Sequence, residues 1–350
     1  MRYEAGNTDD LSGKLSLAAG TTGKLDLGNN NVAFNSALAV AAGTGSTATL
    51  TKEGAGKLTI AAGNNNNLNL SVTAGTLVVN STLGNVSLAA ETTLGGSGTV
   101  GAVTTVSGSI ISPGNSPGNL TSSSVALVGG TNFEWQVQNA TGAAGVGYDT
   151  LTVTGALDVS GASSVNPINL KVISLAGNGD GTALGNPLNF GPPAGASSIR
   201  TFTFATVGSL NLGANANISD AFTIDVSQFT YTDGSSSNAG LWSLSFADNA
   251  ITLTAVPEPS TYGFGLGALA QHLSLLRDHR HVPQRVALLG APIWQRLAQR
   301  LREQGQERID LALASFEQAR QLFDLGAELC VPGHAAIHAA DISALEQQLD

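Results

Sequence analysis

Residues 56–60 read Gly-Lys-Leu-Thr-Ile, and this short pattern recurs near the start of the chain. In every copy a glycine is followed by a polar residue and then by aliphatic residues that alternate with polar ones or run on. The copies are Gly-Lys-Leu-Ser-Leu at 13–17, Gly-Lys-Leu-Asp-Leu at 23–27 and Gly-Thr-Leu-Val-Val at 75–79. A period of two predicts strands with one buried face, which Leu15 and Leu17 would share in the first copy.

Asparagine and glycine clusters at 29–31, 64–67 and 95–96 separate these strands. Both residue types adopt the left-handed backbone readily, so the clusters suit tight corners. Short strands with such corners fit a β-sandwich or barrel. They also fit a β-solenoid, in which each coil stacks only on its neighbours. We expect the asparagine run at 64–67 to be a polar loop, with a side-chain ladder between coils as the alternative.

Composition narrows the class of protein. The chain has 350 residues, of which 11% are charged, 5% are aromatic and 43 are glycine, and its formal net charge is −10. The scarcity of aromatic residues favours a narrow interior of Val, Leu, Ile and Ala. A single cysteine excludes a disulfide scaffold and any multi-cysteine metal site. The acidic balance argues against nucleic acid as a partner, and the abundance of small polar residues indicates a secreted β-rich protein.

The composition changes abruptly near residue 270. Residues 1–260 hold all five lysines and no histidine, whereas residues 271–350 hold no lysine, eight arginines and all five histidines. Such a shift marks a domain boundary or a fusion. We therefore expect a β-rich body over 1–255, a hinge segment over 256–276 and a separate tail over 277–350.

An ordered run of motifs covers about residues 50–160. Residues 51–60 ("TKEGAGKLTI") and 73–80 ("TAGTLVVN") resemble the autotransporter-associated β-strand repeat. The stretches that follow resemble the segments that close such passengers: "LGGSGTVG" at 94–101, "ISPGNSPGNL" at 111–120 and "GYDTLTVTG" at 147–155. The resemblance implies an all-β fold, a right-handed parallel β-helix or β-solenoid, displayed outside a Gram-negative cell. A β-sandwich-like C-terminal part of the body is the alternative.

A second resemblance lies at the hinge. The stretch is similar to the start of the PEP-CTERM sorting signal, and it consists of Val256, Pro257, Glu258, Pro259, Ser260 and Thr261. Two prolines around a glutamate disfavour a helix or a central strand, so an extended, accessible segment is expected. The resemblance implies processing by an exosortase and a transmembrane helix after the motif. An ordinary proline-rich linker is the alternative.

The chain departs from that family in two places. A spanning helix needs about 20 apolar residues, but the apolar stretch at 262–276 is shorter and contains three glycines, so membrane attachment would be weak. About 80 residues then follow, where the family's signal would nearly end the chain. We expect a fusion or frameshift product there. The first residues also lack an apolar signal-peptide core, so we expect the true start to lie upstream.

The tail has a helical period over 286–349, which predicts a short α-helical segment. His334 and His338 are spaced as on one helix face, with Asp341 nearby, and "PGH" at 332–334 faintly resembles a motif of metallo-β-lactamase-fold hydrolases. The main histidine cluster of that family is missing, so we expect solvated histidines and no metal. Cys330 is expected to be a small buried residue rather than a nucleophile.

The body offers little chemistry for catalysis. Acids of the coils are spread along the chain, at Asp26, Glu53, Glu91, Glu134, Asp149 and Asp158. No spacing assigns acid and base roles. Asp149 is the one acid worth testing, although we expect it to cap a turn. We expect no catalytic residue, no cofactor and no bound calcium, and a structural or adhesive protein that associates with extracellular polysaccharide or matrix. A polysaccharide-acting β-helix enzyme and a remnant metallo-hydrolase in the tail are the alternatives.

Overall fold

Strands form where aliphatic side chains alternate with threonine, serine and asparagine, as the period of two predicts. Strand β5 (Ala48–Glu53) and strand β8 (Leu68–Val72) each bury every second residue. Three of the four glycine-led stretches lie mainly in strands, namely β2 (Thr22–Asp26), β6 (Lys57–Ile60) and β9 (Thr76–Val79). The stretch at 13–17 differs, because a 3₁₀ turn, η1 (Ser12–Lys14), precedes the short β1 (Ser16–Leu17).

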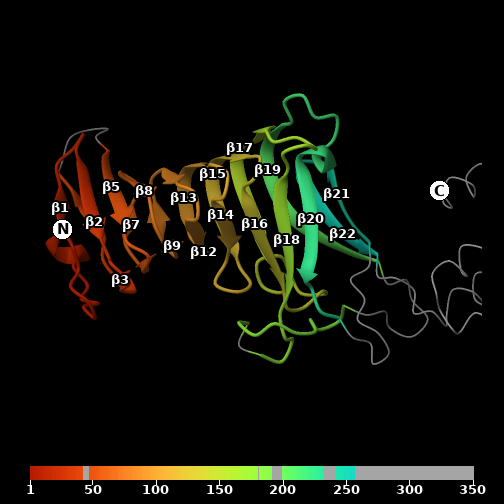
Figure 1. Cartoon of the computed structure of the whole chain (residues 1–350), viewed down its shortest axis with the longest axis horizontal. Coiled ribbons are helices and arrows are strands. Elements are labelled where there is room, and N and C mark those ends of the chain that lie inside the picture. The colour runs from red at the N-terminus through yellow and green to blue at the C-terminus, as the bar shows by residue number, and fades with distance from the viewer. Residues whose placement is uncertain (42–46, 180, 191–198, 232–240, 257–350) are drawn as a thin grey trace, which may run out of the picture. The chain divides into compact units, whose positions relative to one another are not determined.

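The computed structural model describes residues 1–41, 47–179, 181–190, 199–231 and 241–256 (Figure 1). All of them belong to the first of two compact units, Met1–Glu258. The predicted helical tail and the hinge segment beyond Val256 lie outside the described residues. Within the described part of the chain, no helix is long and apolar enough to cross a membrane.

Two long sheets dominate the described residues. The twelve-strand sheet has, in spatial order, β2, β5, β8, β11 (Val86–Leu88), β13 (Thr99–Thr104), β15 (Asn119–Val128), β17 (Thr150–Gly161), β19 (Arg200–Asn211), β22 (Ala250–Val256) and β21 (Leu241–Ala247), with β7 (Asn64–Asn65) and β10 (Thr82–Leu83) beside this path. The eight-strand sheet has β20 (Phe222–Gln228), β18 (Ile168–Ser174), β16 (Asn132–Val137), β14 (Ile110–Pro113), β12 (Thr93–Gly96), β9, β6 and β3 (Val32–Phe34). A separate pair joins β1 to β4 (Ala39–Val40).

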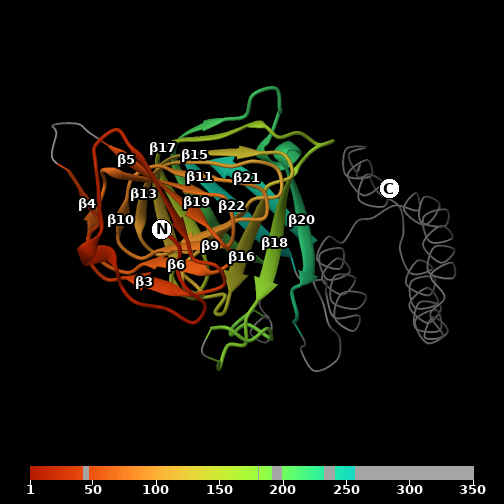
Figure 2. The same cartoon turned by 60° about the vertical axis from the view of Figure 1, so that its left-hand side comes forward.

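The chain passes from one sheet to the other and back, so each turn adds one strand to each sheet (Figures 1 and 2). Neighbouring strands of both sheets are parallel from β2 to β19 and from β3 to β20. This is the solenoid-like arrangement that the sequence predicts. Antiparallel pairing in the long sheets is confined, among the described strands, to β19 with β22 and β22 with β21. The parallel stacking therefore extends to β19 and β20, and the last two described strands, β22 and β21, add antiparallel pairs at the end of the twelve-strand sheet.

Apolar side chains, aliphatic except for Phe133, stack in register inside the coils. In the eight-strand sheet one interior column runs through successive coils as Val32, Leu58, Leu77, Leu94, Ile111, Phe133 and Leu170. All of these side chains are at most 2% exposed. The narrow, shared aliphatic interior expected from the composition is thus present in the early coils.

The coils grow longer toward the end of the body. Paired residues Leu70 and Val86 are 16 apart in sequence, whereas Leu151 and Ala205 are 54 apart. The wider interior is filled by aromatic side chains, since Trp135 lies 5.0 Å from Phe202 and Phe133 lies 4.7 Å from Phe204, measured between ring centroids. The expectation of an interior poor in aromatic residues is wrong for these later coils.

The asparagine run at 64–67 contains a strand. Asn64 and Asn65 form β7, which pairs in parallel with β10 of the next coil. The Oδ1 atom of Asn65 accepts a hydrogen bond from the backbone N–H of Leu38 at 2.7 Å, and Oδ1 of Asn64 accepts one from the Thr82 hydroxyl at 3.2 Å. Asn64 and Asn65 therefore connect coils, as in the alternative, whereas Asn66 and Asn67 form a turn, as the expected loop requires.

Candidate functional site

The predicted sorting motif begins at Val256, which is the last residue that the structure describes. Val256 is the last residue of β22 and pairs with Leu241, and its side chain is partly exposed. The five residues after it lie outside the described part of the chain. The tail residues considered for chemistry, Cys330, His334, His338 and Asp341, also lie outside it.

The acids of the body are dispersed over the coils. Asp26 and Glu53 face each other across β2 and β5, and each has a basic partner: Arg2 lies 3.3 Å from Asp26 and Lys24 lies 3.0 Å from Glu53. Farther along, Glu134 lies 3.8 Å from Lys171 on the neighbouring strand. No group of three histidine, cysteine or acidic side chains in the described part of the chain could hold a metal ion.

Asp149 is the exception, because it is completely buried. Its Oδ1 accepts a 2.7 Å hydrogen bond from the N–H of Gly118, and its Oδ2 accepts a 2.9 Å bond from the N–H of Gln136. The carbonyl oxygen of Asp149 also accepts a hydrogen bond from the indole N–H of Trp135 at 2.6 Å. The carboxylate therefore accepts from the backbone of two other segments, one of them 31 residues away in sequence.

The surroundings of Asp149 set its protonation. Burial raises the pKa of its carboxyl well above the usual value, and the charge of Glu134 acts in the same direction. The two backbone N–H groups oppose this shift, because they stabilise the ionised form. A buried acid with a raised pKa is a common feature of catalytic sites, but structural hydrogen-bond networks perturb pKa values as well.

Lys52 is the residue that sequence reasoning missed. It lies in the interior column of the twelve-strand sheet, in register with Leu25 on one side and Val72 on the other, and it is fully buried. Its Nζ donates hydrogen bonds to the carbonyl oxygens of Gly54 at 2.9 Å and Ala74 at 2.6 Å. The alternation of Ala48, Leu50 and Lys52 could have shown that the lysine is buried, since a period of two places all three side chains on the same face.

Burial lowers the pKa of Lys52 to about 8, and the negative charge of Asp26 opposes the shift. Both carbonyl groups belong to corners of adjacent coils, so the ammonium group connects two turns of the backbone. The contacts of Lys52 thus indicate a structural role, which is to hold two adjacent coils together.

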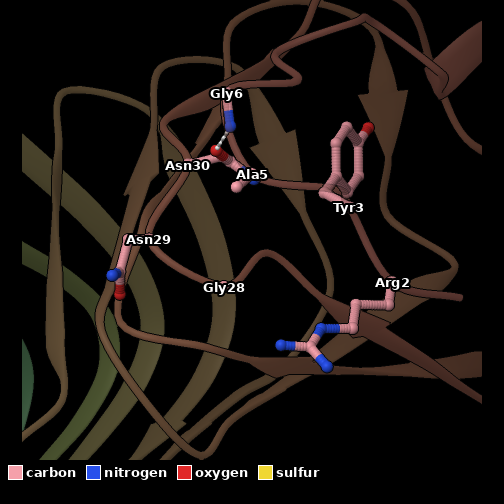
Figure 3. A pocket seen from close by; sticks show the side chains of 7 residues that line it. All are labelled: Arg2, Tyr3, Ala5, Gly6, Gly28, Asn29 and Asn30. Carbon is pink, nitrogen blue, oxygen red and sulfur yellow. Dashed lines mark hydrogen bonds between the residues drawn. The ribbon is translucent and has the colours of Figure 1, made fainter.

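A hollow of about 330 Å³ opens at the N-terminal end of the body (Figure 3). It is lined by Arg2, Tyr3, Ala5, Gly6, Gly28, Asn29 and Asn30. Asn30 accepts a hydrogen bond from the N–H of Gly6 and donates to the carbonyl oxygens of Glu4 and Leu27. The hydroxyl of Tyr3 donates to the carbonyl oxygen of Asp9. These polar groups are engaged in holding residues 1–9 over the first coil, which identifies the hollow as part of a cap.

The outer faces of the coils carry the most regular arrangement of polar groups. On the twelve-strand sheet one column runs in register from Thr51 through Ser71 and Ser87 to Thr104. On the eight-strand sheet Lys57, Thr76 and Thr93 form a similar column. Small hydroxyl side chains, with Lys57 at one end of the second column, therefore repeat at the spacing of the strands, about 4.8 Å.

Comparisons with known proteins add no family to this description. No protein-family model matches the chain, and no curated protein matches it. The architecture and the site residues thus rest on the sequence and the structure themselves.

Proposed function

We propose that the chain is a surface-exposed or secreted β-solenoid of right-handed coil, with a structural or adhesive role and no catalysis. The observation that carries the proposal is that the two faces of each strand bear different kinds of side chain. Inward side chains fill a continuous core, and outward side chains present registered columns of threonine, serine and asparagine. A long, repetitive polar surface of this kind suits many weak contacts with an extended partner.

The second part of the proposal concerns sorting. Val256 through Thr261 would act as a PEP-CTERM-like signal, recognised by an exosortase-like enzyme, with weak membrane attachment through residues 262–276. The two prolines around Glu258 support this, because they disfavour a helix or a central strand and favour an extended segment. The relationship to autotransporter-associated repeat passengers, and a location in the outer membrane or outside the cell, belong to the same proposal.

Surface accessibility tests the proposal. The chain would be expressed behind a secretory leader in a Gram-negative host that has an exosortase, and intact cells would be treated with a protease that cannot enter them. We expect degradation of the wild-type chain on intact cells and a shift to an unprocessed, cell-retained form in the E258A variant. Protection of the wild-type chain in intact cells, or identical processing of both chains, would contradict the proposal.

A further inference from the structure

A shallow groove lies on the outer face of the twelve-strand sheet. Its volume is about 230 Å³, and residues from four consecutive coils line it, on β5, β8, β11 and β13. The polar and small side chains in it are those of Thr49, Asn69, Asn85, Ser87, Ala102 and Thr104. None of the described residues that line the groove is charged.

Two amide groups in the groove are held in one orientation by the backbone. The N–H of Asn85 donates a 2.9 Å hydrogen bond to Oδ1 of Asn69, and the N–H of Ala102 donates a 2.8 Å bond to Oδ1 of Asn85. Each Oδ1 is therefore used between coils, and each Nδ2 has no acceptor within the described part of the chain. Pre-oriented donors lose little entropy when a ligand binds.

The donors repeat along the axis of the solenoid. Asn69 and Asn85 belong to adjacent coils, and Ser87 pairs with Thr104 on the next strand. Neighbouring parallel strands are about 4.8 Å apart, which is close to the length of one sugar unit in an extended β-linked glycan. A linear polymer of that repeat can therefore place one hydroxyl-bearing unit over each coil.

We propose that this groove binds an uncharged, extended polysaccharide, one sugar unit per coil. The inference deepens the adhesive role proposed above and rests on it. An acidic polymer is disfavoured because the groove offers no cation and the chain carries a net charge of −10. The groove also has no aromatic side chain for stacking, so each unit binds weakly and affinity comes from several coils engaging the same polymer.

Affinity electrophoresis of the full chain tests the assignment. Native gels would contain hydroxyethyl cellulose as the neutral polymer or alginate as the acidic one. We expect the neutral polymer, and not alginate, to slow the wild-type chain. The S87E variant places a longer, charged side chain in the groove and should lose most of this retardation. The matched control is S123E, since Ser123 is an exposed serine of the same sheet outside the groove.

The result separates this inference from the general proposal. Absence of retardation by the neutral polymer, or unchanged retardation of S87E, would overturn the groove assignment, whereas surface accessibility of the chain would be unaffected. Circular dichroism would check that S87E retains the β-structure. If it does not, T104E on the next coil replaces it, because Thr104 is also exposed and lines the groove.

Discussion

The Nζ atom of Lys52 donates a 2.6 Å hydrogen bond to the carbonyl oxygen of Ala74, which lies in the next coil. A lysine in an aliphatic column is costly to bury, because its charged form loses hydration. The two carbonyl acceptors at the coil corners offset part of that cost. The lysine therefore fixes how adjacent corners stack, at some expense in stability.

The titration of Lys52 gives the first prediction. Its pKa is lowered to about 8 in the folded chain, so the unfolded chain binds the extra proton between pH 8 and the usual value of 10.5. Stability should then rise as the pH increases through this window, and about 2 kcal/mol of that rise should fall between pH 7.5 and 9.5. Denaturant unfolding at pH 7.5 and 9.5 measures the rise. The K52M variant should lack it, and K57M, which alters an exposed lysine, should retain it.

Asp149 provides a second prediction with the opposite pH trend. Its pKa is raised in the folded chain, so the folded state binds more protons than the unfolded state above pH 4. Stability contributed by this group is therefore present below the usual pKa and is lost as the pH rises through the folded value. We expect D149N to flatten the fall of stability with rising pH above the usual pKa of an aspartate, while E4Q at an exposed acid does not. If the stability of the wild-type chain rose with pH more steeply than that of D149N, the result would contradict the raised pKa of Asp149.

Removal of the Asp149 side chain has a separate effect. The D149A variant leaves the N–H groups of Gly118 and Gln136 without their acceptor. Each orphaned buried donor costs about 1–3 kcal/mol. Equilibrium denaturation should show a loss of that order at neutral pH, and a loss under about 1 kcal/mol would show that water replaces the carboxylate.

The sequence predicted the early coils well and the later ones poorly, for a physical reason. Stretches such as 56–60 and 75–79 alternate with a period of two, and they stack in register as β6 and β9. Periodicity does not show which strands pair with one another. The stretch at 23–27 has the same pattern, and yet it lies in the other sheet. The long coil between Leu151 and Ala205 has no repeat to reveal it.

The site residues show the same limit. The sequence singled out Asp149 as the acid to test, but its partners come from segments distant in the chain, so only the fold reveals what it joins. Lys52 looked like one more polar residue in a motif, although its place in the alternation already put it on the buried face. Asn69 lies in β8 and Asn85 directly precedes β11 in the next coil. Which residues of the two coils meet depends on the length of the coil, and the sequence pattern does not predict that length.

Gly56 offers a fourth test, which concerns coil stacking. A Cβ atom at this position would lie 2.0 Å from the carbonyl oxygen of Asn30 in the preceding coil, where the N–H of Gly56 donates to the carbonyl oxygen of Gly28. Two backbones approach here too closely for any side chain. We expect G56A to lose about 1–3 kcal/mol or more of stability. The control is G13A, because no atom lies within 4 Å of the added methyl group and stability should be nearly unchanged.

The aromatic cluster of the wide coils gives the last prediction. Trp135 is fully buried, packs at 5.0 Å from Phe202 and donates its indole N–H to the carbonyl oxygen of Asp149. Its truncation leaves a cavity and an unpaired acceptor, so W135A should lose about 3–5 kcal/mol. W135F restores much of the volume but not the hydrogen bond, and it should fall between W135A and the wild type. The control is F246A, since Phe246 is 38% exposed and its loss should cost far less in the same denaturant titration. Equal losses for W135A and F246A would mean that the cluster does not hold the wide coils together.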